Sequence, residues 1–239
     1  MVCVVEAAPK SWSMNLIDQI IEELTETSKS LAGPLLKTKV LASRIKEQEI
    51  VDWADKEMTG YRGQDAQLPD YRHCRAVYRG IMQQRGMEMK EGPIPLMIFD
   101  DETKKRFFTP RIEDSVPALE SFINRGDDGG TIRKEYAADI CQFLTMHIIK
   151  ENRTGLRIMT LTSVIDVSEF VQVLSIVRTK LLDFMLKVES EVPALAKPLD
   201  QIQPLQGEDK SKVSKIFYSI INITGENNTV TTGNQNDIK

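Results

Sequence analysis

The sequence has few of the residues from which catalytic and metal sites are most often built. Its 239 residues include only two histidines and three cysteines, and no CxxC, HExxH, P-loop or GxGxxG pattern occurs. Zinc sites need clustered Cys and His ligands, and the common nucleotide sites need glycine-rich loops. We therefore expect no metal ion, no cofactor and no catalytic residues, and we favour a non-enzymatic protein.

Signals for export and for membrane insertion are also missing. Cys3, Cys74 and Cys141 are odd in number and scattered, which favours reduced thiols over a disulfide framework. The opening MVCVV is too short for a signal peptide, and no apolar run approaches the roughly 18 to 20 residues that span a bilayer. We expect a cytoplasmic protein that does not contact membranes.

Aromatic residues and net charge are both modest. Aromatics make up 6% of the chain, so the core must depend mainly on Leu, Ile, Val and Met. A net charge of -4 provides no global attraction to nucleic acid. Nucleic-acid binding therefore needs a local basic patch.

Hydrophobic spacing predicts an α+β fold that is mainly α. Residues 1–13 have no clear periodicity and are set apart as an N-terminal extension. Residues 14–60 have helical spacing, with Asn15 as an N-cap, and residues 114–190 have it again, including 132–150 and a long helix after Asp166. Residues 156–165 are ambiguous. A single domain over 14–192 is expected.

Between the helical sections, residues 61–110 contain glycines and prolines and lose the helical period. Three strands are predicted here, at 71–79, 94–99 and 105–109, with 100–103 as a polar hairpin turn. A small antiparallel sheet is the simplest arrangement.

The end of the chain predicts a different element. Residues 193–212 concentrate prolines and polar residues, which is typical of a linker. In residues 213–239 a strand at 215–224 opens a C-terminal β-hairpin tail with apolar side chains on both faces. An isolated hairpin is marginally stable, so we expect the tail to self-associate or to dock a protein partner, with the strand folding back on the core as the alternative. The assembly residues would be Ile216, Phe217, Tyr218, Ile220, Ile221 and Ile223.

One segment, WADKEMTGYRGQDAQLPDYR, carries a family resemblance. The residues concerned are Trp53, Glu57, Gly60, Tyr61 and the run Leu68–Arg72. With the preceding helix this segment resembles the AbiTii domain of bacterial abortive-infection proteins, over about residues 14–190. The resemblance implies a role in phage resistance and implies no reaction.

The same segment suggests a contact between sections. Trp53 and Glu57 lie one helical turn apart, and Arg72 is a candidate partner for the Glu57 carboxylate. We favour a structural ion pair, and the alternative is a ligand-sensing pocket. The candidate binding residues are Trp53, Glu57, Tyr61, Asp70, Tyr71, Arg72, Arg75 and Arg79.

Two alternatives involve nucleic acid. Residues 62–90 interleave arginines with tyrosines, and a strand at 71–79 would place Tyr71, Arg75 and Arg79 on one face. We prefer a solvated edge strand, because arginines discourage edge pairing. Asp70 with Glu88 and Lys90 imitates the PD-(D/E)xK nuclease pattern, but the neighbouring glycines and Pro93 are unlike a core strand, and short motifs often arise by chance.

Taken as a whole, the residues favour an antiphage defence protein that acts as a sensor or assembly module, most simply as a homo-oligomer. A metal-dependent nuclease and a nucleic-acid-binding module are the alternatives. Convergence of Asp70, Glu88 and Lys90 in a polar cleft would favour the nuclease.

Overall fold

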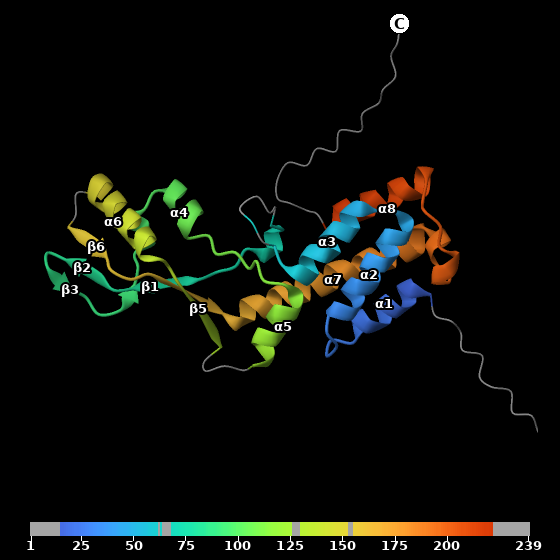
Figure 1. Cartoon of the computed structure of the whole chain (residues 1–239), viewed down its shortest axis with the longest axis horizontal. Helices are drawn as coiled ribbons and strands as arrows, with labels where there is room; N and C mark the ends of the chain where they lie inside the picture. Colours follow the sequence, from blue (N-terminus) through green and yellow to red (C-terminus); the bar gives the residue numbers. More distant parts are fainter. Residues whose placement is uncertain (1–14, 62, 64–67, 126–129, 153–154, 222–239) are drawn as a thin grey trace, which may run out of the picture. The chain divides into compact units, whose positions relative to one another are not determined.

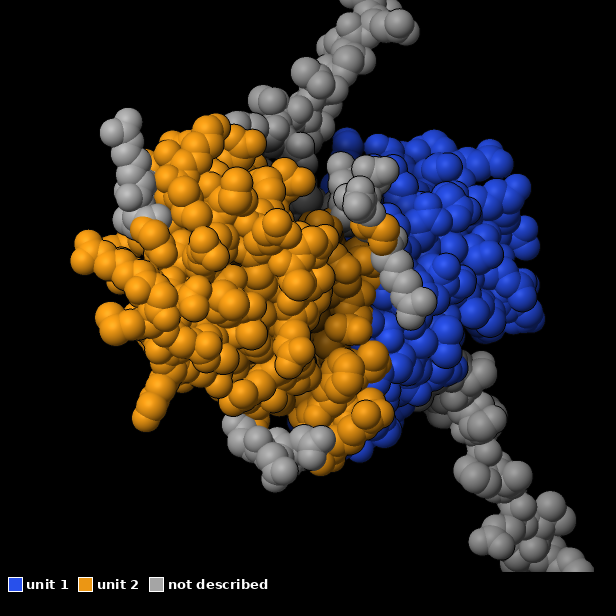
Figure 2. All heavy atoms as spheres, turned by 60° about the vertical axis from the view of Figure 1, so that its left-hand side comes forward, with its two compact units in different colours: residues 1–60, 115–117, 177–221 blue, residues 61–114, 118–176, 222–239 orange. Residues whose placement is uncertain are grey.

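The computed structural model describes residues 15–61, 63, 68–125, 130–152 and 155–221 (Figure 1). It confirms the predicted α+β fold that is mainly α, and it contains two small antiparallel sheets where one was expected. Two compact units can be distinguished (Figure 2). The described part of the first unit comprises residues 15–60, Ser115–Pro117 and Val177–Ile221, and that of the second lies within Tyr61–Asp114 and Ala118–Ile176.

The first unit begins with three helices, as predicted. They are α1 (Leu16–Thr25), α2 (Ala32–Ile45) and α3 (Gln48–Thr59). The Asn15 side chain accepts a hydrogen bond from the Asp18 backbone N–H at 3.0 Å, which satisfies one of the free N–H groups at the start of α1. Apolar residues at helical spacing, such as Ile17, Ile20 and Leu24, are buried.

The rest of the first unit comes from the last third of the chain. It contains the C-terminal part of α7 (Val167–Glu191), the short 3-10 helices η3 (Pro193–Leu195) and η4 (Leu199–Gln201), and α8 (Gly207–Ile220). Arg178 of α7 donates to the carbonyl oxygens of Leu24 and Glu26 at 3.1 and 3.3 Å. These bonds satisfy carbonyls at the end of α1, where the helix itself offers no donor.

The strand predicted at 215–224 is wrong over its described part, because residues 207–220 form α8. Val213, Ile216, Phe217 and Ile221 are buried, and the steps from Val213 to the adjacent pair Ile216 and Phe217 and from Phe217 to Ile221 are three or four residues, which is the period of a helix. The ring of Phe217 lies 6.2 Å from that of Trp53 and 6.0 Å from that of Phe184, measured between centroids. The remainder of the predicted tail, residues 222–239, lies outside the described residues.

The segment predicted as a linker, residues 193–212, is an integral part of the first unit and contains η3, η4 and the start of α8. Leu195, Ile202 and Leu205 are buried between residues 193 and 206. The Leu205 backbone N–H also donates to the Ile45 carbonyl at 3.4 Å. Three buried leucine or isoleucine side chains supply the apolar contacts that a flexible linker lacks.

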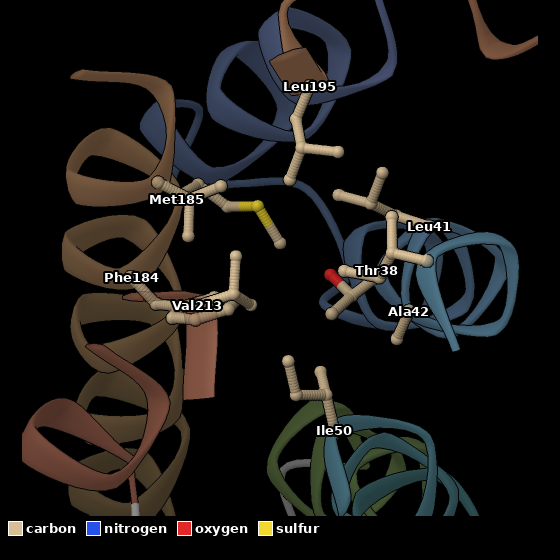
Figure 3. A pocket seen from close by; sticks show the side chains of 10 residues that line it. Thr38, Leu41, Ala42, Ile50, Phe184, Met185, Leu195 and Val213 are labelled. Carbon is tan, nitrogen blue, oxygen red and sulfur yellow. The ribbon is translucent and has the colours of Figure 1, made fainter. Parts of the chain in front are cut away.

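A small void remains in this core, as Figure 3 shows. Its volume is about 10 Å³, and its lining is apolar except for Thr38, whose hydroxyl donates to the Pro34 carbonyl at 2.8 Å. A void of this size is at the lower limit for one water molecule and offers that water no unsatisfied polar partner. It is a packing imperfection and does not constitute a ligand site.

The second unit contains both sheets. The larger sheet has the order β4-β1-β7-β5 and the smaller the order β3-β2-β6, with all neighbours antiparallel. The strands are β1 (Val77–Gly80), β2 (Met82–Gln84), β3 (Met87–Glu88), β4 (Gly92–Pro93), β5 (Thr131–Glu135), β6 (Leu156–Ile158) and β7 (Thr162–Asp166).

Helices cover one side of strands β1, β2 and β6 (Figure 1). They are α4 (Asp101–Phe107) and α6 (Ala138–Asn152). Phe108, directly after α4, and Leu144 and Ile148 of α6 belong to the same buried cluster as Tyr78 of the sheet. The short 3-10 helices η1 (Asp70–Arg72) and η2 (Leu96–Ile98) and the helix α5 (Val116–Asn124) complete the described elements.

Several predicted strand boundaries are wrong in this unit. Residues 105–109 are largely helical, because Asp100 caps α4 by accepting from the Thr103 N–H at 2.7 Å instead of forming a hairpin turn. Only Val77–Gly80 of the predicted strand 71–79 is a strand, and 94–99 contains η2 instead of a strand. The helix predicted over 132–150 is divided into β5 and α6, and the ambiguous 156–165 forms most of β6 and β7.

None of the helices in the described part of the chain has both the length and the apolar character that crossing a membrane requires.

Alanine substitutions in α8 test its helical packing. We expect Ile216→Ala and Phe217→Ala each to lower the free energy of unfolding by about 2–5 kcal/mol, because both side chains are buried. Lys215→Ala, at an exposed position, should change it by about 0.5 kcal/mol or less. Urea denaturation measures all three. Unchanged stability in both Ile216→Ala and Phe217→Ala would contradict the packing of α8 described here.

Candidate functional site

The register of the strands changes by one residue where the larger sheet meets the smaller. Arg79 of β1 lies opposite Thr162 of β7, and Met82 of β2 lies opposite Ile158 of β6. Two residues, 80 and 81, therefore face three residues, 159–161. This extra residue is a β-bulge, which bends a strand pair and interrupts its hydrogen bonding.

Gly80 allows the two chain segments to approach closely at this bulge. A Cβ atom at position 80 would lie 2.0 Å from the Thr160 carbonyl oxygen, so only glycine fits. The Ile81 carbonyl accepts from the Met159 N–H at 2.8 Å, and the Ile81 N–H donates to Thr160 Oγ1 at 2.9 Å. The bulge is therefore fixed by hydrogen bonds on both sides of Ile81.

A cleft of about 370 Å³ opens beside the bulge. Its volume lies within the roughly 300–1,000 Å³ typical of small-molecule sites. Cys141 and Leu161 are buried in its wall, whereas Glu91, Arg133 and Glu135 are exposed. The lining residues are Gly80, Ile81, Glu91, Arg133, Glu135, Tyr136, Ala138, Cys141, Met159, Thr160, Leu161 and Thr162.

The charged groups of the cleft are not all neutralised by one another. The Arg79 guanidinium lies 3.5 Å from the Glu91 carboxylate. Arg133 makes no ion pair with another residue in the described part of the chain. Thr162 lies opposite Arg79 on one side and Glu135 on the other, so these three side chains share one sheet face. The cleft thus offers a guanidinium together with two carboxylates.

The thiols in this unit are held in their neutral form. Burial, reinforced by the negative charge of Glu169, raises the pKa of Cys74 to about 11. Burial also raises the pKa of Cys141. The nucleophile of a cysteine enzyme needs the opposite shift. No group of three or more His, Cys, Asp or Glu side chains suited to a metal ion occurs among the described residues.

The most prominent residues of the AbiTii-like segment lie in the protein interior. Arg72 is fully buried, 5.0 Å from the centroid of the Tyr61 ring, and donates to the carbonyls of Ile112, at 3.3 Å, and Asp114. In the first unit, Trp53 and Glu57 are buried in α3. Their burial favours structural roles for all four side chains. The pairing of Glu57 with Arg72 remains a prediction.

The predicted surface of Tyr71, Arg75 and Arg79 does not form as one strand face. Tyr71 belongs to η1 and Arg75 precedes β1, so only Arg79 of the three lies in a strand. Asp70 is exposed in η1. Glu88 is exposed in β3, and Lys90 follows it, so the ExK motif lacks the buried core strand of the nuclease pattern.

The predicted assembly residues differ in how far they are buried. Ile216, Phe217 and Ile221 are buried, Ile220 is half-buried and Tyr218 is 42% exposed. Ile223 lies outside the described residues. The apolar side chains that were expected to be buried against a partner are thus largely buried within the first unit.

Sequence reasoning missed the residues that line the cleft. Arg133 and Glu135 lie in a segment predicted as helix, and Thr160 in one left ambiguous. Gly80 is one of several glycines between residues 61 and 110, and no local pattern distinguishes it. The signal that defines the site is the one-residue change of register, which depends on pairing between segments about 80 residues apart.

Fold and cleft together define a two-unit α+β protein with a cleft of ligand size that is lined by both charged and apolar side chains. The AbiTii family model matches residues 15–215, and the chain therefore belongs to the AbiTii family. Membership suggests abortive-infection defence, a form of phage resistance in bacteria. Comparisons with curated proteins and with solved structures gave no match.

A Gly80→Ala substitution tests the close approach at the bulge. We expect it to lower the free energy of unfolding by about 1–3 kcal/mol or more, because the new methyl group would overlap a backbone oxygen. Gly92→Ala is the control, since its Cβ would meet the nearest atom, the Lys90 oxygen, at an ordinary 3.6 Å. Thermal melts compare the two variants, and equal stabilities would contradict the described bulge.

The raised thiol pKa of Cys74 predicts slow alkylation. At pH 8 we expect Cys74 to react about a hundredfold more slowly than a free cysteine of ordinary pKa near 8.5, with the rate rising as the pH approaches about 11. Peptide-resolved mass spectrometry after iodoacetamide treatment measures this, and the urea-unfolded chain is the control. Equal rates in folded and unfolded protein would show that the thiol is activated or freely exposed.

Proposed function

We propose that this protein acts in abortive-infection defence as a non-enzymatic sensor, and that the cleft beside the bulge binds a small polar ligand with an anionic group. The observation that carries the proposal is a cleft of ligand size in which Arg133 has no ion-pair partner among the described residues. A guanidinium offers a planar pair of donors suited to a carboxylate or phosphate.

The other groups of the cleft complement such a ligand. Glu91 and Glu135 are acceptors for ligand hydroxyl or amino groups, and Thr160 offers a hydroxyl. Leu161 and Cys141 give the wall an apolar part. Small-molecule sites commonly combine an apolar wall with a few polar groups that fix the orientation of the ligand.

The alternatives gain less support from the same residues. A polyanion such as nucleic acid would meet Glu91 and Glu135 beside Arg79 and Arg133, so the mixture of charges disfavours it. A nuclease of the PD-(D/E)xK type would need Glu88 and Lys90 on a core strand, and both are exposed. A cysteine nucleophile would need a lowered thiol pKa, and burial raises those of Cys74 and Cys141.

Substitution of Arg133 tests the proposal in cells. We expect Arg133→Ala and Arg133→Glu to abolish phage protection in plating assays while the purified variants keep the wild-type melting temperature, because Arg133 is exposed. Loss of one charged hydrogen-bonding group costs about 1.5–3 kcal/mol of ligand binding, or roughly 10- to 150-fold in affinity.

Arg157→Ala supplies the matched control. Arg157 is an exposed arginine on β6 of the same unit that does not line the cleft. Its replacement should leave plating unchanged. Full protection by both Arg133 variants would refute the cleft as the sensing site, and an equal loss with Arg157→Ala would indicate a general need for positive charge.

A further inference from the structure

Beyond the cleft, the second unit has an exposed apolar surface formed by α4 and α6. We call it the α4–α6 face and define it by Glu102, Arg106 and Phe107 of α4 with Phe143 and Met146 of α6. The rings of Phe107 and Phe143 lie 5.3 Å apart, which joins the two helices. Phe143 is 46% exposed and Met146 is 62% exposed. Arginine, methionine and aromatic residues together are enriched in protein interfaces.

The Arg106 guanidinium lies over two aromatic rings of this face. Its guanidinium carbon lies 5.1 Å from the centroid of Phe107 and 5.9 Å from that of Phe143. Such stacking leaves the N–H groups at the guanidinium edge available for a carboxylate. No carboxylate among the described residues pairs with Arg106. The cation thus contacts two aromatic rings and has no acidic partner in the part of the chain that the structure describes.

Glu102 provides the opposite charge on the same helix. It lies four residues before Arg106, is exposed, and makes no ion pair with another described residue. A glutamate four residues before an arginine ordinarily forms a favourable pair. Here the guanidinium lies over the two rings instead. The Glu102 carboxylate and the Arg106 guanidinium are therefore exposed one turn apart on α4, and neither has an ion-pair partner among the described residues.

We infer that the α4–α6 face binds a second copy of this chain across a two-fold axis. A two-fold axis perpendicular to α4 makes the two α4 helices antiparallel. Glu102 of each copy then faces Arg106 of the other, so both unused charges are paired at once. Phe143 and Met146 lie against the same residues of the partner and lose their exposed apolar surface.

A second copy bound at the α4–α6 face is favoured over a second copy that pairs with the edge of the sheet. The outer strand β5 exposes Arg133, Lys134 and Glu135, and charged side chains on an edge strand discourage strand pairing. On the α4–α6 face, Glu102 and Arg106 have opposite charges. A two-fold axis therefore places each of them opposite its counterion in the second copy. A single surface thus supplies both halves of the contact.

Charge exchange tests the inference on the full chain. Sedimentation equilibrium over a range of concentrations should show a monomer–dimer equilibrium for the wild type. Arg106→Glu and Glu102→Arg should each weaken the dimer about tenfold or more, because two symmetry-related pairs become repulsive. The double variant Glu102→Arg with Arg106→Glu should recover most of the affinity, since the pairs re-form with their signs exchanged.

Two further variants separate surface contact from folding. Met146→Arg should shift the chain to monomer, whereas Leu36→Arg, at a 50% exposed position of α2, should not. Circular dichroism melts must match the wild type for each variant compared. A monomeric wild type at every concentration, or a dimer unaffected by Met146→Arg, would overturn the proposal. Failure of the double variant to recover affinity would overturn the two-fold pairing.

Discussion

The approach of Gly80 to the Thr160 carbonyl is the constraint on which the second unit depends. A side chain at position 80 would come within 2.0 Å of that oxygen, so the bulge forms only with glycine. The bulge places two residues opposite three, separates the two sheets and opens the cleft between the segments that it displaces. The cleft is therefore a consequence of backbone geometry, and the selectivity that we propose for it depends on the charged side chains in its lining.

The elements that could be predicted from the sequence are those whose signals are local. Asn15 caps α1 and the long apolar stripe of α7 gives its helical period, and both helices are present. Short apolar segments are ambiguous, because Ile216, Phe217 and Ile221 fit a helix period as well as the β-branched and aromatic composition of a strand. The edge strand β5 went unrecognised because Arg133, Lys134 and Glu135 are unusual in strands.

The candidate site was less predictable than the fold, and for a different reason. The motif residues that stand out in the sequence, such as Tyr61 and Arg72, are buried and hold the second unit together through ring and carbonyl contacts. The residues that line the cleft, such as Arg133 and Thr160, belong to no motif. They meet only because distant strands pair with a one-residue offset, and no local pattern encodes that offset.

If the protein senses infection through this cleft, as we propose, infected cells must contain a small molecule that the cleft binds. Hydrogen–deuterium exchange of the intact purified chain tests it most directly, with low-molecular-weight extracts of phage-infected and uninfected cells as probes. Our account predicts that only the infected extract slows exchange at residues 131–136 and 159–162, and that Arg133→Ala removes this effect. Protection confined to other segments, or identical exchange with both extracts, would contradict it.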